Sequence, residues 1–304
     1  MFRQFRSHRY LSELLQVNLF LPMKERTPSR TALRVALRRA AHQLLDDPNV
    51  LDDPLAVRIV GDAVQEIHQK PSLHRSRTGR HLRAFMVARS RYAEDQLSAS
   101  VARGVEQYVV LGAGLDTSAF RSTASPDARI FEVDHPDTQA WKIACVQAAQ
   151  IPIPPTLRFV PVDFERQNLP TELAVAGLRT NRPTFFSWLG VVPYLTRKAA
   201  TQTFAFIGGF PPGSGVVFDY AVSPLSLGVL ERLALEALSA RVARIGEPLQ
   251  LFFTPEDLDA LLDGRGFRRI EQLAAKEINE QYFAHREDSL KVSGAADRIV
   301  SAWT

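Results

Sequence analysis

A chain of 304 residues that is 45% hydrophobic and 23% charged has the composition of a soluble globular protein with a full hydrophobic core. Its 37 basic and 33 acidic residues leave a net charge of only +4, which does not indicate a nucleic-acid surface. The single cysteine, Cys145, excludes an intrachain disulfide and a multi-cysteine metal site. We therefore expect no metal and no need for an oxidising compartment.

The N-terminal segment, residues 1–22, is basic and then fairly apolar. Glu13, Gln16 and Asn18 interrupt its apolar part, and no small-residue cleavage site is obvious, so it does not have the pattern of a signal peptide. We interpret it as a peripheral arm, with Met23 as an alternative start. Because no run of about 18 uninterrupted apolar residues occurs, we expect no membrane span and a cytoplasmic protein.

The next part of the chain has a helical pattern. From Ser29 to Leu45, leucines and alanines recur at helical spacing with arginines on the other side. Two Asp-Pro pairs mark turns or helix starts within Asp46–Gly61. A second long helical pattern covers His81–Gly104 and ends at a glycine. These features predict a helical cap at residues 23–104.

Short apolar runs follow, as expected of strands that are buried on both faces. They are Gln107–Gly114, Ala128–Asp134, Leu157–Phe164, Pro183–Val191 and Ser214–Val222. Helical patterns lie between them, at Pro136–Gln150, Pro170–Leu178 and Arg197–Gly208. A further helix is expected within Leu225–Gly246, and a capped helix with a sixth strand within Thr254–Leu273. Alternating strands and helices predict an α/β fold with a doubly wound, mostly parallel sheet. We expect one domain at 23–304, with the sheet core at 105–304.

Polar residues and glycines gather where these strands end, which is where ligands bind in parallel sheets. In strand order they are Gly112, Gly114 and Asp116; Asp134; Asp163 and Phe164; and Trp188, Gly190 and Tyr194. Asp134, twenty residues past Gly114, suits the hydroxyls of a ribose. After the third strand, Asp163 offers a carboxylate to accept from an exocyclic amine, and Phe164 offers a ring to stack on a base. Together, the four strand ends predict an adenosine site.

Each of these features also has a plain structural interpretation. Asp134 can simply cap the helix that begins near Pro136, and Phe164 can belong to the core. A dinucleotide site would have a third glycine where this chain has Thr117, and Asp116 stands where a pyrophosphate would disfavour negative charge. S-adenosylmethionine has an ammonium, a sulfonium and no phosphate, so these departures favour it over a nicotinamide dinucleotide.

Five segments in order resemble the leucine carboxyl methyltransferase-like family, within class I S-adenosylmethionine-dependent methyltransferases. They are "ARSRYAED", "GVEQYVVLGAGLDTSAFR", "IFEVDHPDTQAWK", "RFVPVDFE" and "FFSWLGVVPYLT". With "TPSRTALRVALRRA" and "VLDDPLAVRIV", they resemble its bacterial branch of polyketide and secondary-metabolite O-methyltransferases, over Lys24–Tyr282. The resemblance implies a seven-stranded sheet whose last strand is antiparallel, with S-adenosylmethionine as methyl donor and S-adenosylhomocysteine as product.

The same resemblance implies roles for individual residues. Arg89 would grip the methionine carboxylate, Gly112 and Gly114 would back the cofactor, and Asp134 would hold its ribose. The adenine would lie against Asp163 and Phe164. The family often carries a glutamate where this chain has Leu189, which leaves Trp188, Gly190 and Tyr194 as the matched residues of that segment.

These observations predict an O-methyltransferase acting on a carboxyl or hydroxyl group of a small metabolite. Methyl transfer from a sulfonium is an in-line displacement, in which positioning supplies most of the help. A carboxylate needs no base, whereas a phenol or alcohol usually needs one, and no decisive base is evident. Tyr194 is a candidate for orienting the acceptor or for core packing.

Two alternative functions are a nicotinamide-dependent oxidoreductase and a catalytically silent cofactor-binding homologue. The sequence gives no positive evidence for a protein carboxyl terminus as the acceptor. We expect no nucleic-acid or membrane partner, and the oligomeric state is open.

Overall fold

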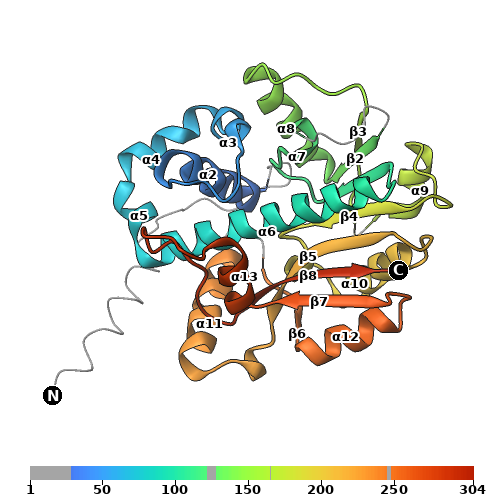
Figure 1. Ribbon diagram of the computed structural model, residues 1–304. Coiled ribbons are helices and arrows are strands. Elements are labelled where there is room, and N and C mark those ends of the chain that lie inside the picture. Colours follow the sequence, from blue (N-terminus) through green and yellow to red (C-terminus); the bar gives the residue numbers. More distant parts are fainter. Residues whose placement is uncertain (1–28, 122–127, 165, 245–247) are drawn as a thin grey trace.

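The computed structural model describes residues 29–121, 128–164, 166–244 and 248–304. The expected arm at residues 1–22 lies outside these ranges. The described chain forms a single sheet with helices on both faces, as the alternating pattern predicts (Figure 1). Its strands are β1 Gln107–Leu111, β2 Arg129–Asp134, β3 Leu157–Pro161, β4 Thr184–Trp188, β5 Gly215–Val222, β6 Phe252–Phe253, β7 Arg269–Leu273 and β8 Asp297–Trp303.

The strands follow the order β3-β2-β1-β4-β5-β8-β7, with the short β6 pairing only with β5. All pairs are parallel except those of β8, which runs antiparallel to both β5 and β7. The mostly parallel, doubly wound sheet is thus confirmed, and the two-residue β6 adds an eighth strand to the seven expected. The order reverses beside β1, so the ends of β1 and β4 border the crevice where such sheets bind ligands.

Several of the helices begin where a side chain caps their first turn. The helices are α2 Arg30–Leu45, α3 Pro54–Ile59, α4 Gln65–Gln69, α5 Pro71–Arg75, α6 Arg77–Ala102, α7 Ser118–Arg121, α8 Pro136–Ala148, α9 Leu169–Val175, α10 Arg197–Gly208, α11 Val229–Arg244, α12 Pro255–Asp263 and α13 Ala275–Tyr282. The Ser29 hydroxyl accepts from the Ala32 N–H at the start of α2. The long helix α6 begins four residues before the expected His81, because Ser76 caps it by accepting from the Gly79 N–H.

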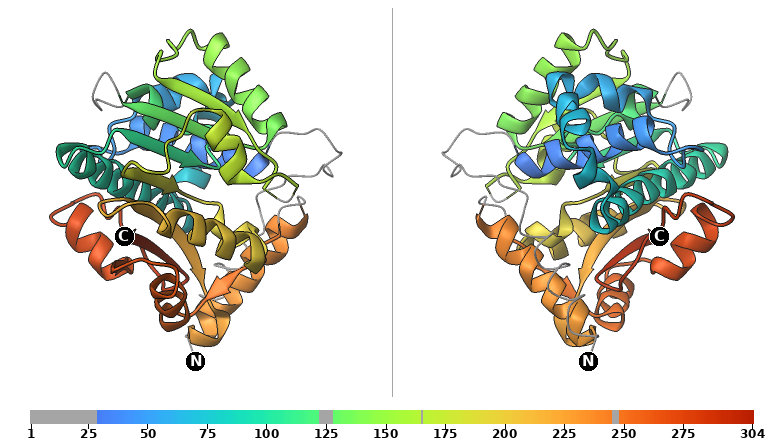
Figure 2. Two further views of the ribbon diagram at one scale, coloured as in Figure 1. Left: turned by 90° about the vertical axis from the view of Figure 1, so that its right-hand side faces the viewer. Right: turned by 90° about the vertical axis from the view of Figure 1, so that its left-hand side faces the viewer.

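The sheet separates two hydrophobic clusters. In β1, Val109 and Leu111 face the cluster that contains residues of α9, α10 and α12, while Tyr108 and Val110 face the one formed with α6 and α13. A third cluster joins α2, α3 and α4 to α8. Figure 2 shows the N-terminal helices beside α6 on one side of the sheet, with α10 on the other. Burial on both faces explains why the central strands β1, β4 and β5 are mostly apolar.

Candidate active site

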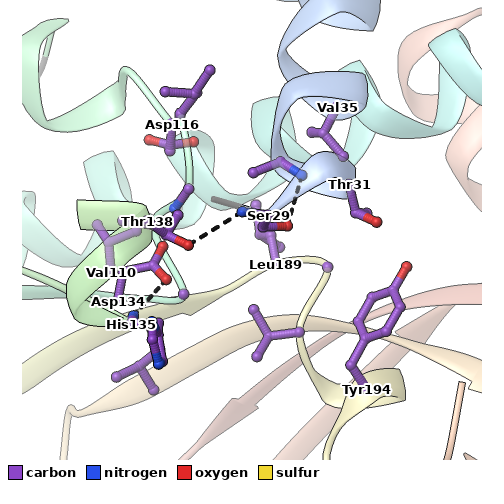
Figure 3. Close-up of a pocket in the computed structure, with 18 of the residues that line it drawn as sticks. Ser29, Thr31, Val35, Val110, Asp116, Asp134, His135, Thr138, Leu189 and Tyr194 are labelled. Carbon is purple, nitrogen blue, oxygen red and sulfur yellow. Dashed lines mark hydrogen bonds between the residues drawn. The ribbon is translucent and has the colours of Figure 1, made fainter. Parts of the chain in front are cut away.

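A cavity of about 520 Å³ opens at the carboxyl ends of β1 to β4, under the N-terminal end of α2. It brings together nine of the ten residues that the sequence singles out: Arg89, Gly112, Gly114, Asp116, Asp134, Asp163, Phe164, Gly190 and Tyr194. Figure 3 shows Asp116, Asp134 and His135 on one side of this cavity and Thr31, Val35, Leu189 and Tyr194 on the other. Residues as far apart in the chain as Ser29 and Gln250 therefore line one site.

Trp188 is the exception. Its side chain is fully buried in the core, and it meets Phe204 edge-on with ring centroids 5.1 Å apart. It does not line the cavity. The reason is the two-residue period of a strand: Ser187, on the other face of β4, lines the cavity, while Trp188 points to the helix side with α10.

Asp134 fixes the turn that follows β1. Its Oδ2 accepts from the Gly114 N–H at 2.5 Å, and its Oδ1 accepts from the His135 N–H at 2.7 Å. Burial raises the pKa of this carboxyl above its usual value. Asp134 does not cap α8: the cap is His135, whose Nδ1 accepts from the Asp137 N–H at 3.3 Å. The capping interpretation of Asp134 is therefore wrong, and its carboxylate faces the cavity (Figure 3).

The glycines of the turns are required by close contacts between neighbouring loops. Gly112 has φ +66°, and a Cβ at this position would overlap the side chain of Val191, which follows β4. Gly114 has φ +48°, and a Cβ there would lie 3.0 Å from the Cβ of Ala32 in α2. Only glycine adopts such backbone angles without strain. The loops after β1 and β4 and the helix α2 can therefore pack closely around one cavity.

The charge of Asp116 is compensated inside the protein. Its Oδ2 accepts from Arg39 Nη1 at 3.1 Å, and its Oδ1 accepts from the backbone N–H and the hydroxyl of Ser118. Burial alone would raise the pKa of this carboxyl, but Arg39, Lys142 and Ser118 together hold it below its usual value. The expected attraction of Asp116 for a cationic ligand is thus smaller than its isolated charge suggests, because a buried arginine already pairs with it.

Thr117, at the position of a third glycine, has a structural partner. Its buried hydroxyl donates to Asp53, whose side chain also caps α3. Arg39 Nε lies 3.5 Å from one oxygen of Asp53, and Arg121 Nε lies 3.0 Å from the other. This buried network ties the cap helices to the turn after β1. Neither Arg39 nor Asp53 was predicted as a site residue; the one signal in the sequence is the Asp-Pro helix start at Asp53.

Arg89 is almost completely buried, at 4% exposure, and still lines the cavity. Its Nη1 donates to Asp219 in β5 at 2.7 Å. Its Nε has no hydrogen-bond partner among the described residues. Asp219 was also missed, although an acid within the apolar run of β5 is a signal in itself, because a charged residue is rarely buried without a partner.

A second buried ion pair lies beneath the turn. Lys142 of α8 and Glu132 of β2 are at most 1% exposed, and Nζ lies 2.7 Å from Oε2. Burial raises the pKa of Glu132 to about 7, although Lys142 opposes the shift. The positive charge of Lys142 also lowers the pKa of Asp116 and acts in the same direction on Asp134. Lys142 therefore favours the ionised form of both cavity acids.

The remaining predicted residues lie at the two ends of the cavity. The Phe164 ring lines the cavity and also packs against the core cluster, so its predicted place at the ligand site and its place in the core are compatible. Asp163 lies beside it, with Oδ2 4.0 Å from His135 Nε2 and 3.6 Å from Arg166 Nε. Leu189, which occupies the position where the family often has a glutamate, lines the cavity on the same side as Tyr194 (Figure 3).

Two kinds of feature do not occur in the part of the chain that the structure describes. None of its helices is long and apolar enough to cross a membrane. The same described ranges hold no group of three or more histidine, cysteine, aspartate or glutamate side chains arranged to bind a metal ion.

Comparisons with known proteins agree with this architecture. The model of the family described as "Leucine carboxyl methyltransferase" matches residues 32–208, more than half of the chain. A Bacillus subtilis protein named "Putative S-adenosyl-L-methionine-dependent methyltransferase YktD" is 32% identical over 291 residues, covering 88% of this chain and 95% of that protein. A protein of Mycolicibacterium paratuberculosis with the same description is 29% identical over 282 residues, covering 86% of this chain and 89% of that one.

Among solved structures, a methyltransferase from Thermobifida fusca, titled as putative, has a TM-score of 0.53 at 15% identity, covering 92% of this chain and 96% of that one. At this identity the likeness concerns the fold, which is the class I methyltransferase fold. The family match and the long alignment with the Bacillus subtilis protein go further. The chain belongs to the leucine carboxyl methyltransferase family, a family of S-adenosylmethionine-dependent methyltransferases.

Proposed function

We propose that this S-adenosylmethionine-dependent methyltransferase methylates an oxygen atom, in a carboxyl or hydroxyl group, of a small metabolite of the polyketide or other secondary-metabolite type. The observation that carries the proposal is the two-sided cavity. One side holds Asp116 and Asp134, with Asp163 4.0 Å from His135 on the same side, and the other is formed by Thr31, Val35, Leu189 and Tyr194 (Figure 3). We assign the first side to the cofactor and the second to the acceptor.

The residues of the first side have suitable chemistry for S-adenosylmethionine. Asp134 accepts one backbone hydrogen bond on each oxygen, and a carboxylate oxygen can accept a second, so both can take a ribose hydroxyl. Asp163 and Phe164 offer an acceptor for the adenine amine and a ring for its face. Arg89 has a buried Nε without a partner among the described residues, and a carboxylate would satisfy it. The Arg89 Nε and the remaining acceptor capacity of Asp134 are thus groups of the chain that the cofactor would satisfy.

In this assignment the turns shape the floor, and Trp188 supports it from the core. Gly112, Gly114 and Gly190 keep the turns close to the ligand, while Asp116 acts mainly by holding its own turn to Arg39. The cofactor supplies, when bound, a methyl group on a positively charged sulfur. The chain's own residues orient the two reactants and exclude water between α2 and the strand ends, which are the contributions that positioning can make.

The acceptor side consists mainly of uncharged groups. Leu189 and Val35 present aliphatic surface, and the hydroxyls of Thr31 and Tyr194 lie at the same end (Figure 3). Such a wall suits an acceptor with an apolar body, and Tyr194 is in position to orient its nucleophilic oxygen. The leucine at position 189 makes this wall less acidic than in family members that carry glutamate there, so an acceptor oxygen meets less negative charge.

The cofactor assignment is tested by calorimetry with S-adenosylhomocysteine on the wild-type protein, Asp134→Ala and Asp137→Ala. Loss of hydrogen bonds to a carboxylate costs about 1.5–3 kcal/mol each, so we expect Asp134→Ala to weaken binding by about tenfold or more. Asp137 is a matched control, because it lies three residues away, its side chain is 42% exposed and it does not line the cavity. Equal affinities for the two variants would refute the ribose assignment.

The acceptor assignment is tested by methyl transfer from labelled S-adenosylmethionine to a panel of aliphatic carboxylic acids, phenols and polyketide acids. We expect a methyl ester or methyl ether from at least one apolar member. Binding of the cofactor without transfer to any member of a broad panel would instead support a catalytically silent homologue. A nicotinamide dinucleotide serves as a binding control, and we expect no competition from it.

A further inference from the structure

Asp219 connects three elements beneath the cavity. It lies in β5 at 5% exposure, and its two oxygens accept from different parts of the wall. Oδ2 accepts from Arg89 Nη1 of α6 at 2.7 Å, and Oδ1 accepts from the Gly190 backbone N–H at 2.5 Å. One buried side chain therefore holds both the arginine and the turn that follows β4.

The guanidinium of Arg89 is confined on a second side by the same turn. Gly190 has φ +71°, and a Cβ built on it would lie 2.8 Å from Nη2 and 3.0 Å from Nη1 of Arg89. The guanidinium thus rests directly on the Cα of Gly190, while Asp219 binds its Nη1 end. With these two contacts, the side that carries the unpartnered Nε keeps one orientation relative to the cavity that Arg89 lines.

A buried guanidinium needs such a counter-ion. Removing one partner of a buried ion pair leaves an uncompensated charge, and the cost is usually avoided by movement of the remaining side chain. Without Asp219, the Gly190 N–H would also lose its acceptor, so the turn beneath the guanidinium would be released at the same time. Both effects displace Arg89, and neither requires Asp219 to touch a ligand.

We propose that Asp219 is a positioning residue, which sets the Arg89 guanidinium for recognition of the carboxylate at the amino-acid end of the cofactor. This inference rests on the role proposed above for Arg89. It places part of the cofactor selectivity in the sheet, at a residue of β5 that itself does not line the cavity.

The test compares two ligands that differ only at the amino-acid end. S-adenosylhomocysteine carries the carboxylate and the ammonium, whereas 5′-methylthioadenosine has neither. Their dissociation constants are measured by calorimetry for the wild type, Asp219→Ala, Asp219→Asn, Arg89→Ala and the double variant Arg89→Ala/Asp219→Ala. Tyr220→Phe is the matched control, because Tyr220 is the next residue of β5, is equally buried, and its hydroxyl donates to Gln272 away from the cavity.

We expect Asp219→Ala to weaken S-adenosylhomocysteine by about tenfold or more, and 5′-methylthioadenosine by no more than about twofold. Asp219→Asn keeps the size of the side chain and one acceptor, so we expect a smaller loss with the same selectivity. The double variant should bind no more weakly than Arg89→Ala, since coupled residues are not additive. We expect Tyr220→Phe to leave both ligands unchanged.

Two sets of results would overturn the inference. If Asp219→Ala weakens both ligands equally or neither of them, Asp219 has no selective role. If its effect adds fully to that of Arg89→Ala, the two side chains act independently. If Arg89→Ala keeps the wild-type preference for S-adenosylhomocysteine over 5′-methylthioadenosine, Arg89 does not recognise the carboxylate, and the role proposed for Arg89 itself is refuted. Failure of the inference and failure of the proposed function are therefore distinguishable in one set of titrations.

Discussion

Gly190→Ala tests how closely the turn after β4 and Arg89 depend on each other. The added Cβ would lie 2.8 Å from Nη2, whereas ordinary contacts begin near 3.4 Å, so the guanidinium must retreat by about 0.6 Å. Asp219 restrains this retreat by its bond to Nη1. We therefore expect the variant to fold but to hold Arg89 away from its present position.

A matched control separates this contact from backbone strain. Gly61 also has positive φ, at +52°, but a Cβ built on it meets nothing within 4 Å. A non-glycine residue in this region costs about 1–2 kcal/mol. We expect Gly190→Ala and Gly61→Ala to lower the free energy of unfolding by similar amounts of this order. The guanidinium is the end of a flexible side chain, so its displacement adds little to the folding cost.

The two variants should differ in cofactor binding. Small displacements of positioning groups have large effects, so we expect Gly190→Ala to weaken S-adenosylhomocysteine by about tenfold, and Gly61→Ala to leave its affinity unchanged. Urea titrations give the unfolding free energies and calorimetry gives the dissociation constants. If both variants bind with wild-type affinity, the present position of the Arg89 guanidinium does not matter for the cofactor, and the reasoning from this contact is refuted.

Two further variants test the buried charges. Thr117→Val removes the hydroxyl that donates to Asp53, so we expect the free energy of unfolding, measured by urea titration, to fall by about 1–3 kcal/mol. Thr203→Val is the control, because its hydroxyl bonds only within α10, and we expect it to change stability much less. Equal losses in the two variants would contradict a special role for the network around Asp53. Burial and the charge of Asp219 raise the pKa of Asp297 from 3.8 to about 7, so between these values the folded state binds the proton that the unfolded chain has released, and the free energy of unfolding falls as pH rises from about 4 to 7. Asp297→Asn should therefore reduce the fall of unfolding free energy between about pH 4 and 7, and an unchanged slope would show that this carboxyl does not titrate in that range.

Local signals account for most of the predicted elements. The strands β1 to β5 appear within a few residues of their expected positions, because each contains a short, mostly apolar run, and β1, β4 and β5 are buried along their whole length. The helix α2 begins where Ser29 precedes an amphipathic pattern. The strand β8, by contrast, was implied only by the family resemblance. Its place between β5 and β7 depends on pairing with strands that come before it in the chain.

The site divides in the same way. Strand ends can be located along the chain, and the parallel sheet must bring them to one edge, so the sequence was sufficient to gather Gly112, Asp134 and Asp163 around one cavity. The side on which Trp188 points could not be obtained in this way, because a shift of one residue along a strand reverses the face.

Charge is where the sequence alone was least informative. In the sequence, Asp116 has no evident partner, but in the structure it pairs with Arg39, which lies 77 positions away. Arg89 likewise pairs with Asp219, which lies 130 positions away. The pattern of apolar residues and glycines determined the sheet, the edge that binds the cofactor and the family. The tertiary structure decided which charges remain available to a ligand, because an ion pair depends on distances in space that the order of residues does not encode.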